Sequence, residues 1–299
     1  MLKKFSIVLV LLAGIFWGSS PLFVSTLGEL GFTSLQITAI RLILAAPILH
    51  ICLLIIDRKG YRLPLKAYAL LFLLGIGSIL TMCLTYFYAM TVTSAAVSSV
   101  LLYTSPIFVM VMSVFIFKER FTKKKALCLT LAVLGCALTS GIIGGIQGTA
   151  FGVFVGLLSG FTYSIYGIIS TFILRMGASP IACTTHGFTF AALGALFITN
   201  PIELVSDISA CGFNLLTVWF LPLFSLCTAV IPFLLYTFGL AGTKPDAAAI
   251  AASSEPVVCT IVGVLLLNQP ITVFQIIGII LVIAAIIILN FNFKRNKVK

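Results

Sequence analysis

The sequence is poor in charged residues. Only 8% of its 299 residues are Asp, Glu, Lys or Arg, seven of them acidic, whereas 61% are hydrophobic. This balance excludes a soluble globular domain. Apolar runs of about 20 residues recur along the chain, and each is long enough to cross ~30 Å of hydrocarbon. Because the runs are continuous rather than alternating, they predict an all-α polytopic membrane protein and not a β-barrel.

The sequence also lacks the motifs of several function classes. It has no GxxxxGK[ST] phosphate loop, so nothing in it supports ATP-driven transport. It has no HxxxH or GxGD motif, which argues against an intramembrane enzyme. The eight cysteines show no CxxC spacing and have no His neighbours at metal-ligand spacing. We therefore expect no catalytic residue, no metal and no cofactor.

We predict ten membrane-spanning helices, separated by short loops that carry glycine and proline. The first one begins like a secretory signal peptide. Residues 12–18 nevertheless resemble residues 158–164, and a cleaved segment has no reason to match an internal helix. The predicted spans are 5–27, 34–56, 66–90, 95–117, 124–143, 149–173, 179–199, 215–240, 246–267 and 271–292.

The basic residues predict the orientation of the chain. If the N-terminus is cytoplasmic, seventeen of the eighteen Lys and Arg residues fall in cytoplasmic segments. The charged residues of the outer loops are then Glu29, Glu203 and Asp207. Because Lys and Arg favour the cytoplasmic side, we expect a multi-pass plasma-membrane protein with both termini cytoplasmic. The basic tail, 293–299, would meet anionic lipid, and no nucleic-acid partner is needed.

The two halves of the sequence repeat each other. Residues 95–140 match residues 245–290 at a constant offset of 150. Five helices per copy is an odd number, so the second copy would cross the membrane upside down, as in secondary transporters. The predicted repeats are 5–143 and 149–292. The correspondence pairs Trp17 with Tyr163, Arg41 with His186, Tyr86 with Tyr236, Pro106 with Pro256 and Glu119 with Gln269.

These features together resemble a known family. The motif residues are GIFWGSSPLF at 14–23, the Arg-Leu pair at 41–42, SPIFVMVMSVFIFKERFTKKK at 105–125 and SSEPVVCTIVGVLLLNQPIT at 253–272. Over residues 5–292 the chain resembles the EamA-type members of the drug/metabolite transporter superfamily. The resemblance implies two five-helix repeats and ATP-independent movement of small metabolites, often amino acids or amphipathic compounds. Gln269 departs from the family pattern, which more often has Glu there.

One acidic residue lies deep in a predicted span. Glu255 is about nine residues into the ninth helix, roughly 14 Å deep at 1.5 Å per residue. An ionisable group near the midplane costs ~2.5–3.5 kcal/mol and is a functional candidate. Glu255 would carry a proton or balance a cationic substrate. The alternative is a hydrogen-bonded Glu255 that, with Ser253 and Ser254, fixes a bend at Pro256.

Two prolines lie in the middle of predicted spans. Pro106 and Pro256 each remove a backbone hydrogen bond, which predicts a kink in the fourth and ninth helices. Freed carbonyls are tolerated in a membrane where they line a cavity or meet polar side chains. We predict that both kinks lie beside a central cavity, with plain packing kinks as the alternative.

Aromatic and basic residues complete the candidate site. Trp17, Tyr163, Tyr86, Tyr236 and Tyr103 offer ring faces that would hold a cation or stack an aromatic or amphipathic solute. An interfacial aromatic belt is the alternative for such residues, although it does not suit Trp17 and Tyr163 at mid-depth.

The Arg-His pair of the two repeats has several possible roles. Arg41 keeps its proton and so needs water, a carboxylate or carbonyls. It would contact a substrate carboxylate, tether two helices or form a gate. His186 would titrate near neutral pH or serve as a hydrogen-bonded packing residue.

The favoured function is a secondary active carrier that works by alternating access. The two repeats would rock around a cavity lined by the first, third, fourth, sixth, eighth and ninth helices, and export a small organic metabolite. Proton-coupled uptake of a cationic nutrient is the alternative, and a receptor or structural role is a third class. The expected partners are a small-molecule substrate and the lipid bilayer, for a monomer or a homodimer.

Overall fold

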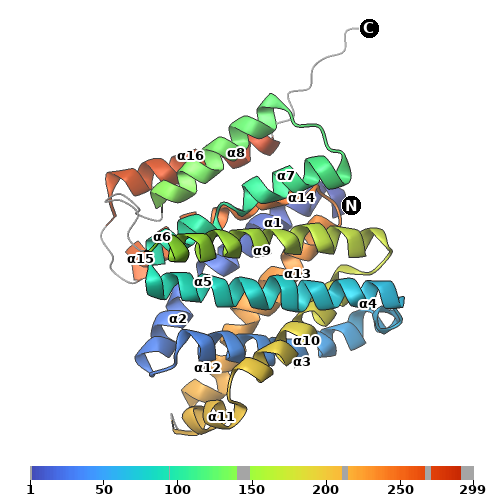
Figure 1. Cartoon of the computed structure of the whole chain (residues 1–299), viewed down its shortest axis with the longest axis vertical. Helices are drawn as coiled ribbons and strands as arrows, with labels where there is room; N and C mark the ends of the chain where they lie inside the picture. The colour runs from blue at the N-terminus through green and yellow to red at the C-terminus, as the bar shows by residue number, and fades with distance from the viewer. Residues whose placement is uncertain (1, 94, 140–148, 211–214, 267–270, 291–299) are drawn as a thin grey trace.

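The computed structural model describes the whole chain except residues 1, 94, 140–148, 211–214, 267–270 and 291–299 (Figure 1). The described residues form helices and no strand. The helices are α1 Leu2–Gly18, α2 Ser20–Glu29, α3 Ser34–Ile56, α4 Leu65–Phe72, α5 Thr81–Val92, α6 Ala95–Leu102, α7 Ser105–Phe117, α8 Lys123–Thr139, α9 Ala150–Arg175, α10 Pro180–Ile198, α11 Pro201–Ala210, α12 Leu215–Ser225, α13 Ile231–Leu240, α14 Pro245–Ala252, α15 Ser254–Leu266 and α16 Val273–Asn290.

Eight helical stretches of the described chain are long and apolar enough to cross a membrane. They are Phe5–Glu29, Ser34–Ile56, Leu65–Tyr86, Val97–Phe117, Ala150–Arg175, Pro180–Ile198, Trp219–Leu240 and Pro245–Leu266. The protein is therefore a multi-pass membrane protein.

The two other predicted spans, 124–143 and 271–292, correspond to α8 and α16, which pack along each other at the top of Figure 1. The apolar stretch of α16, Val273–Leu289, is shorter than the eight. Part of each predicted span lies outside the described residues, at 140–143 and 291–292.

Three long helices are interrupted just before a proline. α1 passes into α2 at Ser19, α6 into α7 at Tyr103–Thr104, and α14 into α15 at Ser253. At each break one backbone N–H bonds three residues back, with N···O distances of 3.1 Å from Ser19 and 3.2 Å from both Thr104 and Ser253. Proline lacks the N–H that would continue the α-helical ladder. The prolines that follow are Pro21, Pro106 and Pro256.

The break before Pro21 was not predicted, although the Ser-Ser-Pro sequence at 19–21 resembles Thr-Ser-Pro at 104–106 and contains the same signal.

Two π-helical segments also interrupt the bundle. They are η2, Leu73–Leu80, between α4 and α5, and η3, Leu226–Val230, between α12 and α13. Their last residues are 150 positions apart, the offset that relates the two halves of the sequence. The two segments therefore occupy equivalent places in the two halves. Such segments often mark functional sites.

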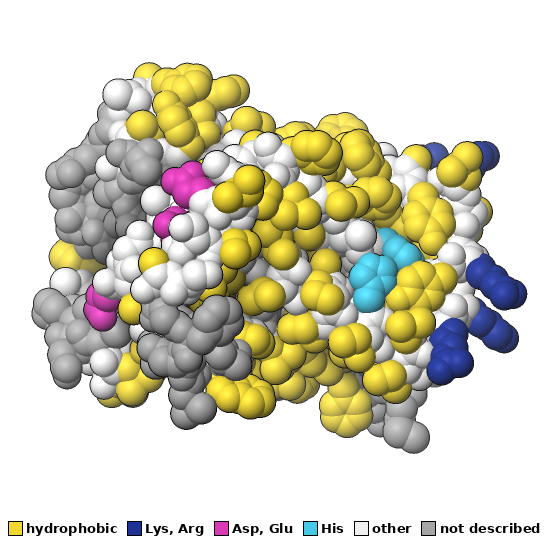
Figure 2. Space-filling view, turned by 90° about the horizontal axis from the view of Figure 1, so that it is seen from below, with side chains coloured by type: hydrophobic (Ala, Val, Ile, Leu, Met, Phe, Trp, Pro, Cys, Tyr) yellow, Lys and Arg dark blue, Asp and Glu magenta, His cyan; other side chains and the backbone are white. Residues whose placement is uncertain are grey.

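The charged side chains separate toward the two ends of the molecule. Figure 2 shows Lys and Arg at one end of the visible face and Asp and Glu toward the other end. The apolar side chains lie between them, as expected for a belt that faces lipid.

Candidate functional site

The carboxyl group of Glu255 lies where a broken helix resumes. Glu255 is in the first turn of α15, directly after the break at Ser253 and before the buried Pro256. A helix N-terminus has unsatisfied N–H groups and a partial positive charge, which favours an acidic side chain there. The proline break thus creates, in the interior of the membrane protein, a place suited to a carboxylate.

Two glycines bring α1 close to this carboxylate. A Cβ on Gly14 would overlap the hydroxyl of Ser254, and one on Gly18 would lie 2.9 Å from the carbonyl oxygen of Glu255. Small residues allow helix backbones to approach closely in membranes. The glycine pair therefore sets how α1 and α15 pack, and keeps Glu255 beside α1.

Glu255 is surrounded by tyrosines. The hydroxyl of Tyr103 is hydrogen-bonded to its carboxyl group. Tyr86 and Tyr163 are close enough to act on it electrostatically. The hydroxyls of Tyr86 and Ser99 are 3.1 Å apart. Tyr103 is at the break between α6 and α7, so the breaks of the fourth and ninth predicted helices meet at Glu255.

Arg41 contributes the opposite charge to the same region. It is close enough to act electrostatically on Glu255 and on Tyr86. Its Nη2 donates to the sulfur of Cys83 at 3.0 Å, whereas its buried Nε has no hydrogen-bond partner among the described residues. The ion pairs within 4.0 Å in the described chain do not include Arg41 with Glu255.

The aromatic side chains form one cluster beside this charge pair. The buried ring of Trp17 lies 6.3 Å from Tyr163, 5.0 Å from Phe233 and 5.6 Å from Tyr236, measured between ring centroids. Tyr236 in turn lies 5.8 Å from Tyr166. Helices α1, α9 and α13 thus place their rings together. Sequence reasoning gave no role to Phe233.

The two serines before Glu255 differ in their bonding. The hydroxyl of Ser253 lies 3.4 Å from the carbonyl oxygen of Ala249 and also interacts with the thiol of Cys136. The buried hydroxyl of Ser254 has no hydrogen-bond partner among the described residues. This hydroxyl packs against Gly14 of α1 and belongs to the residue next to Glu255.

His186 belongs to a different cluster. Its Nε2 lies 3.0 Å from the carbonyl oxygen of Gly60, and its ring contacts those of His50, Tyr61 and Tyr68. Figure 2 shows the two histidines together, nearer the basic end of the molecule. The structure therefore does not bring His186 to Arg41, although the repeat pairs their positions in sequence.

Among the described residues, no three His, Cys, Asp or Glu side chains come together in a way that could hold a metal ion.

Comparisons with known proteins agree with the helical architecture. A solved crystal structure superposes with a TM-score of 0.79 at 16% sequence identity, over 96% of each chain, which shows a shared fold. Proteins called "uncharacterized transporter" align over most of their length. One from Archaeoglobus fulgidus is 26% identical over 93% of this chain and 94% of its own, and YoaV of Bacillus subtilis is 26% identical over 88% and 89%.

A third such transporter, from Clostridium kluyveri, is 24% identical over 97% of this chain and 93% of its own. Together with the family match that follows, these relatives support a membrane transporter. The EamA-like transporter family model matches residues 4–141 and again 150–291, so the chain belongs to the EamA-like transporter family. This agrees with the predicted resemblance to the drug/metabolite transporter superfamily.

Proposed function

We propose that the protein is a secondary active carrier that exports a small zwitterionic metabolite, such as an amino acid, by alternating access. The observation that carries the proposal is the pairing of Glu255 with Arg41. The two opposite charges influence each other in the protein interior without forming an ion pair. A zwitterionic solute between them would satisfy both.

The cost of burying charges supports a zwitterionic solute at this site. A charge in the membrane interior is costly unless it is paired or reaches water. The buried Nε of Arg41 lacks a partner among the described residues, and Glu255 and Arg41 both remain partly exposed within the bundle. The carboxylate of a substrate would bind Arg41, and its ammonium group would bind Glu255.

The aromatic cluster supports an apolar or aromatic side chain on the solute. Tyr163 is close enough to act electrostatically on Glu255, and the ring of Trp17 lies 6.3 Å from that of Tyr163. Such rings bind apolar groups and cations alike. The site therefore suits an amphipathic molecule with charges at one end. Transport would follow the rocking of the two halves, with the breaks at Ser19, Thr104 and Ser253 as hinges.

The proposal includes the predicted topology. The protein would lie in the plasma membrane with ten spans in two inverted repeats, 5–143 and 149–292. Both termini would then be cytoplasmic. The separation of charges in Figure 2 supports this orientation. The match of the family model to each half supports the repeats.

Counterflow in proteoliposomes tests the function. Saturable exchange of an amino acid by the purified protein is the expected result. Glu255→Gln and Arg41→Gln should each raise KM on the order of 10- to 100-fold, because a hydrogen bond to a charged group contributes ~1.5–3 kcal/mol. Glu203→Gln on the exposed α11 is the matched control and should behave as wild type. Unsaturable, ion-like conductance would contradict the proposal.

The second candidate is proton-coupled uptake of a cationic nutrient. It is favoured by the tyrosines around Glu255 and by the contact that already engages Arg41 with Cys83. Under this alternative, Glu255→Gln abolishes proton-driven accumulation while counterflow persists. Binding without any flux would instead indicate a receptor.

A further inference from the structure

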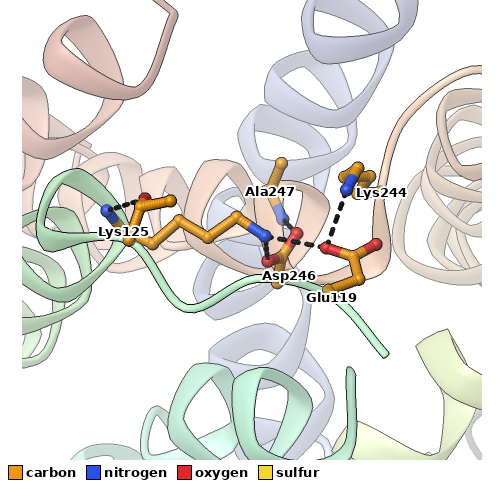
Figure 3. A network of polar contacts seen from close by, with 6 residues as sticks. Glu119, Lys125, Lys244, Asp246 and Ala247 are labelled. Carbon is orange, nitrogen blue, oxygen red and sulfur yellow. Dashed lines mark hydrogen bonds and ion pairs between the residues drawn. The ribbon is translucent and has the colours of Figure 1, made fainter. Parts of the chain in front are cut away.

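A second set of charges lies at one end of the bundle, away from Glu255. Nζ of Lys125 is 2.7 Å from the carboxylate of Glu119 and also contacts the carboxylate of Asp246. Nζ of Lys244 is 3.1 Å from the same Glu119 oxygen. Figure 3 shows the four side chains meeting at the start of α14. We call these four residues the ionic network.

The two carboxylates are well buried for charged groups. The side chain of Glu119 is 6% exposed and that of Asp246 is 2% exposed. Burial alone would raise the pKa of Glu119, but its bonds to Lys125 and Lys244 outweigh burial and lower the pKa. Buried ion pairs lose much stability when one partner is removed, because the other charge is left uncompensated.

Local backbone geometry fixes both carboxylates. At the end of α7, Lys118 adopts a left-handed conformation, and the N–H of Glu119 donates to the carbonyl of Ser113 at 3.2 Å. The left-handed residue ends α7, and Glu119 is the next residue after this cap. Asp246 lies in the first turn of α14, where its Oδ1 accepts from the N–H of Ala247 at 2.7 Å.

The ionic network joins the end of α7 to the start of α14, each of which is one half of a helix interrupted by a break. α7 runs from the break at Thr104 to the network, and α14 runs from the network to the break at Ser253. The two half-helices pack on each other. Their other ends meet at Glu255 through Tyr103. Separating α7 from α14 would open a path from this end of the bundle to the candidate site, and the network opposes that separation.

The positions that the repeat makes equivalent to these four carry no charge. The positions 150 residues from Glu119, Lys125, Asp246 and Lys244 are Gln269, Gln275, Ala96 and Ser94. Gln275 caps its own helix, since its Oε1 accepts from the N–H of Thr272 at 2.9 Å. Gln275 and Thr272 thus form a capping box, in which a side-chain acceptor bonds the backbone N–H of the cap residue. Lys125 stands at the equivalent position but has only donors, so it cannot form this bond. It contacts Glu119 and Asp246 instead.

We propose that the ionic network is a latch that holds this end of the bundle closed, and that the lack of charges at the four equivalent positions makes the closed state at this end the resting state. The positive-inside pattern places the latch on the cytoplasmic side. The proposal rests on the alternating-access function above. Each transport cycle would break the contacts of Lys125 with Glu119 and Asp246 and then re-form them.

Hydrogen exchange of the full-length protein in lipid nanodiscs, without any solute, tests the latch. Lys125→Gln should make the amides of α14 and of the last turn of α7 exchange on the order of tenfold faster, because the closed state is less populated. Lys123→Gln is the matched control. Lys123 is exposed and forms none of the ion pairs of the described chain, so exchange should equal that of wild type.

A charge reversal covers the case in which Lys125→Gln does not fold. Lys125→Asp should speed exchange, and adding Asp246→Lys should restore it toward wild type, because the attraction is rebuilt with exchanged signs. Equal exchange in Lys125→Gln, Lys123→Gln and wild type would overturn the latch, as would a double variant that stays fast. The exchange experiment contains no solute, so it is independent of the counterflow assay. Faster exchange in Lys125→Gln would support the latch even if counterflow showed that the protein moves no amino acid, a result that would refute only the proposed carrier.

Discussion

At the scale of single residues, the site combines satisfied and unsatisfied polar groups. Glu255 receives a hydrogen bond from Tyr103, whereas the Nε of Arg41 and the hydroxyl of Ser254 are buried without partners among the described residues. A buried polar atom without a partner costs ~1–3 kcal/mol. Such atoms indicate a role other than stability, and in this site the role we assign is contact with the solute.

Ser254→Ala tests this assignment. Removing an unsatisfied hydroxyl should leave the melting temperature unchanged or raise it, while KM for the solute increases several-fold through one lost hydrogen bond of ~1 kcal/mol. Ser78→Ala is the control, since the buried hydroxyl of Ser78 donates to the carbonyl of Thr162 at 2.7 Å. That variant should melt lower. Equal losses of stability in both variants would contradict the assignment.

At the scale of elements, the protein depends on close helix contacts and on helix breaks. α9 crosses the break between α6 and α7, and a Cβ on its Gly160 would lie 2.6 Å from the carbonyl oxygen of Leu101. The Leu101 carbonyl belongs to the backbone, which cannot shift to relieve such a clash as easily as the end of a flexible side chain can. The contact therefore fixes where α9 lies relative to the break that carries Tyr103.

Gly160→Ala should lower the melting temperature by several degrees, because overpacking a tight contact costs ~1–3 kcal/mol. Gly28→Ala is the matched control. No atom of the described residues lies within 4 Å of the Cβ it would add, and alanine favours a helix over glycine by roughly 0.5–1 kcal/mol. This variant should be as stable as wild type or more so. Thermal unfolding of the two purified variants in detergent would compare them, and similar melting points would refute the tight contact.

At the scale of the whole molecule, charge distribution and duplication act together. On the face shown in Figure 2, basic side chains gather at one end and acidic side chains lie toward the other. Under the proposed topology, inverted copies of one five-helix unit would give the same scaffold at both ends. Differences such as Lys125 against Gln275 then decide how the two ends behave.

Protease-cleavable tags at both termini test the topology. Because Lys and Arg stay on the cytoplasmic side, both tags should be cut in inside-out vesicles and neither in right-side-out vesicles. A cleavage site inserted next to Asp207 in α11 should show the reverse pattern. Opposite accessibility of the two termini would mean an odd number of spans and would refute the ten-helix topology.

Features that depend on local chemistry could be predicted from the order of the residues alone. Apolar runs defined the helices, and Pro106 and Pro256 marked two of the three breaks, because a missing N–H acts on its own helix. The tight approach of α1 to Glu255 follows the small residues at Gly14 and Gly18. The repeat also follows from residue order, although its inverted arrangement in the membrane stays a prediction.

Which side chains meet could be seen only once the helices were packed, because the rotation of a helix about its axis depends on its neighbours. The packing settles these contacts. It placed Trp17, Tyr163 and Tyr236 together, and Arg41 near Glu255, but took His186 to His50 and Tyr61 instead. It also joined Lys125 to Asp246, 121 residues further along the chain. Periodicity cannot reveal such contacts, since they arise only when helices from both halves pack against each other.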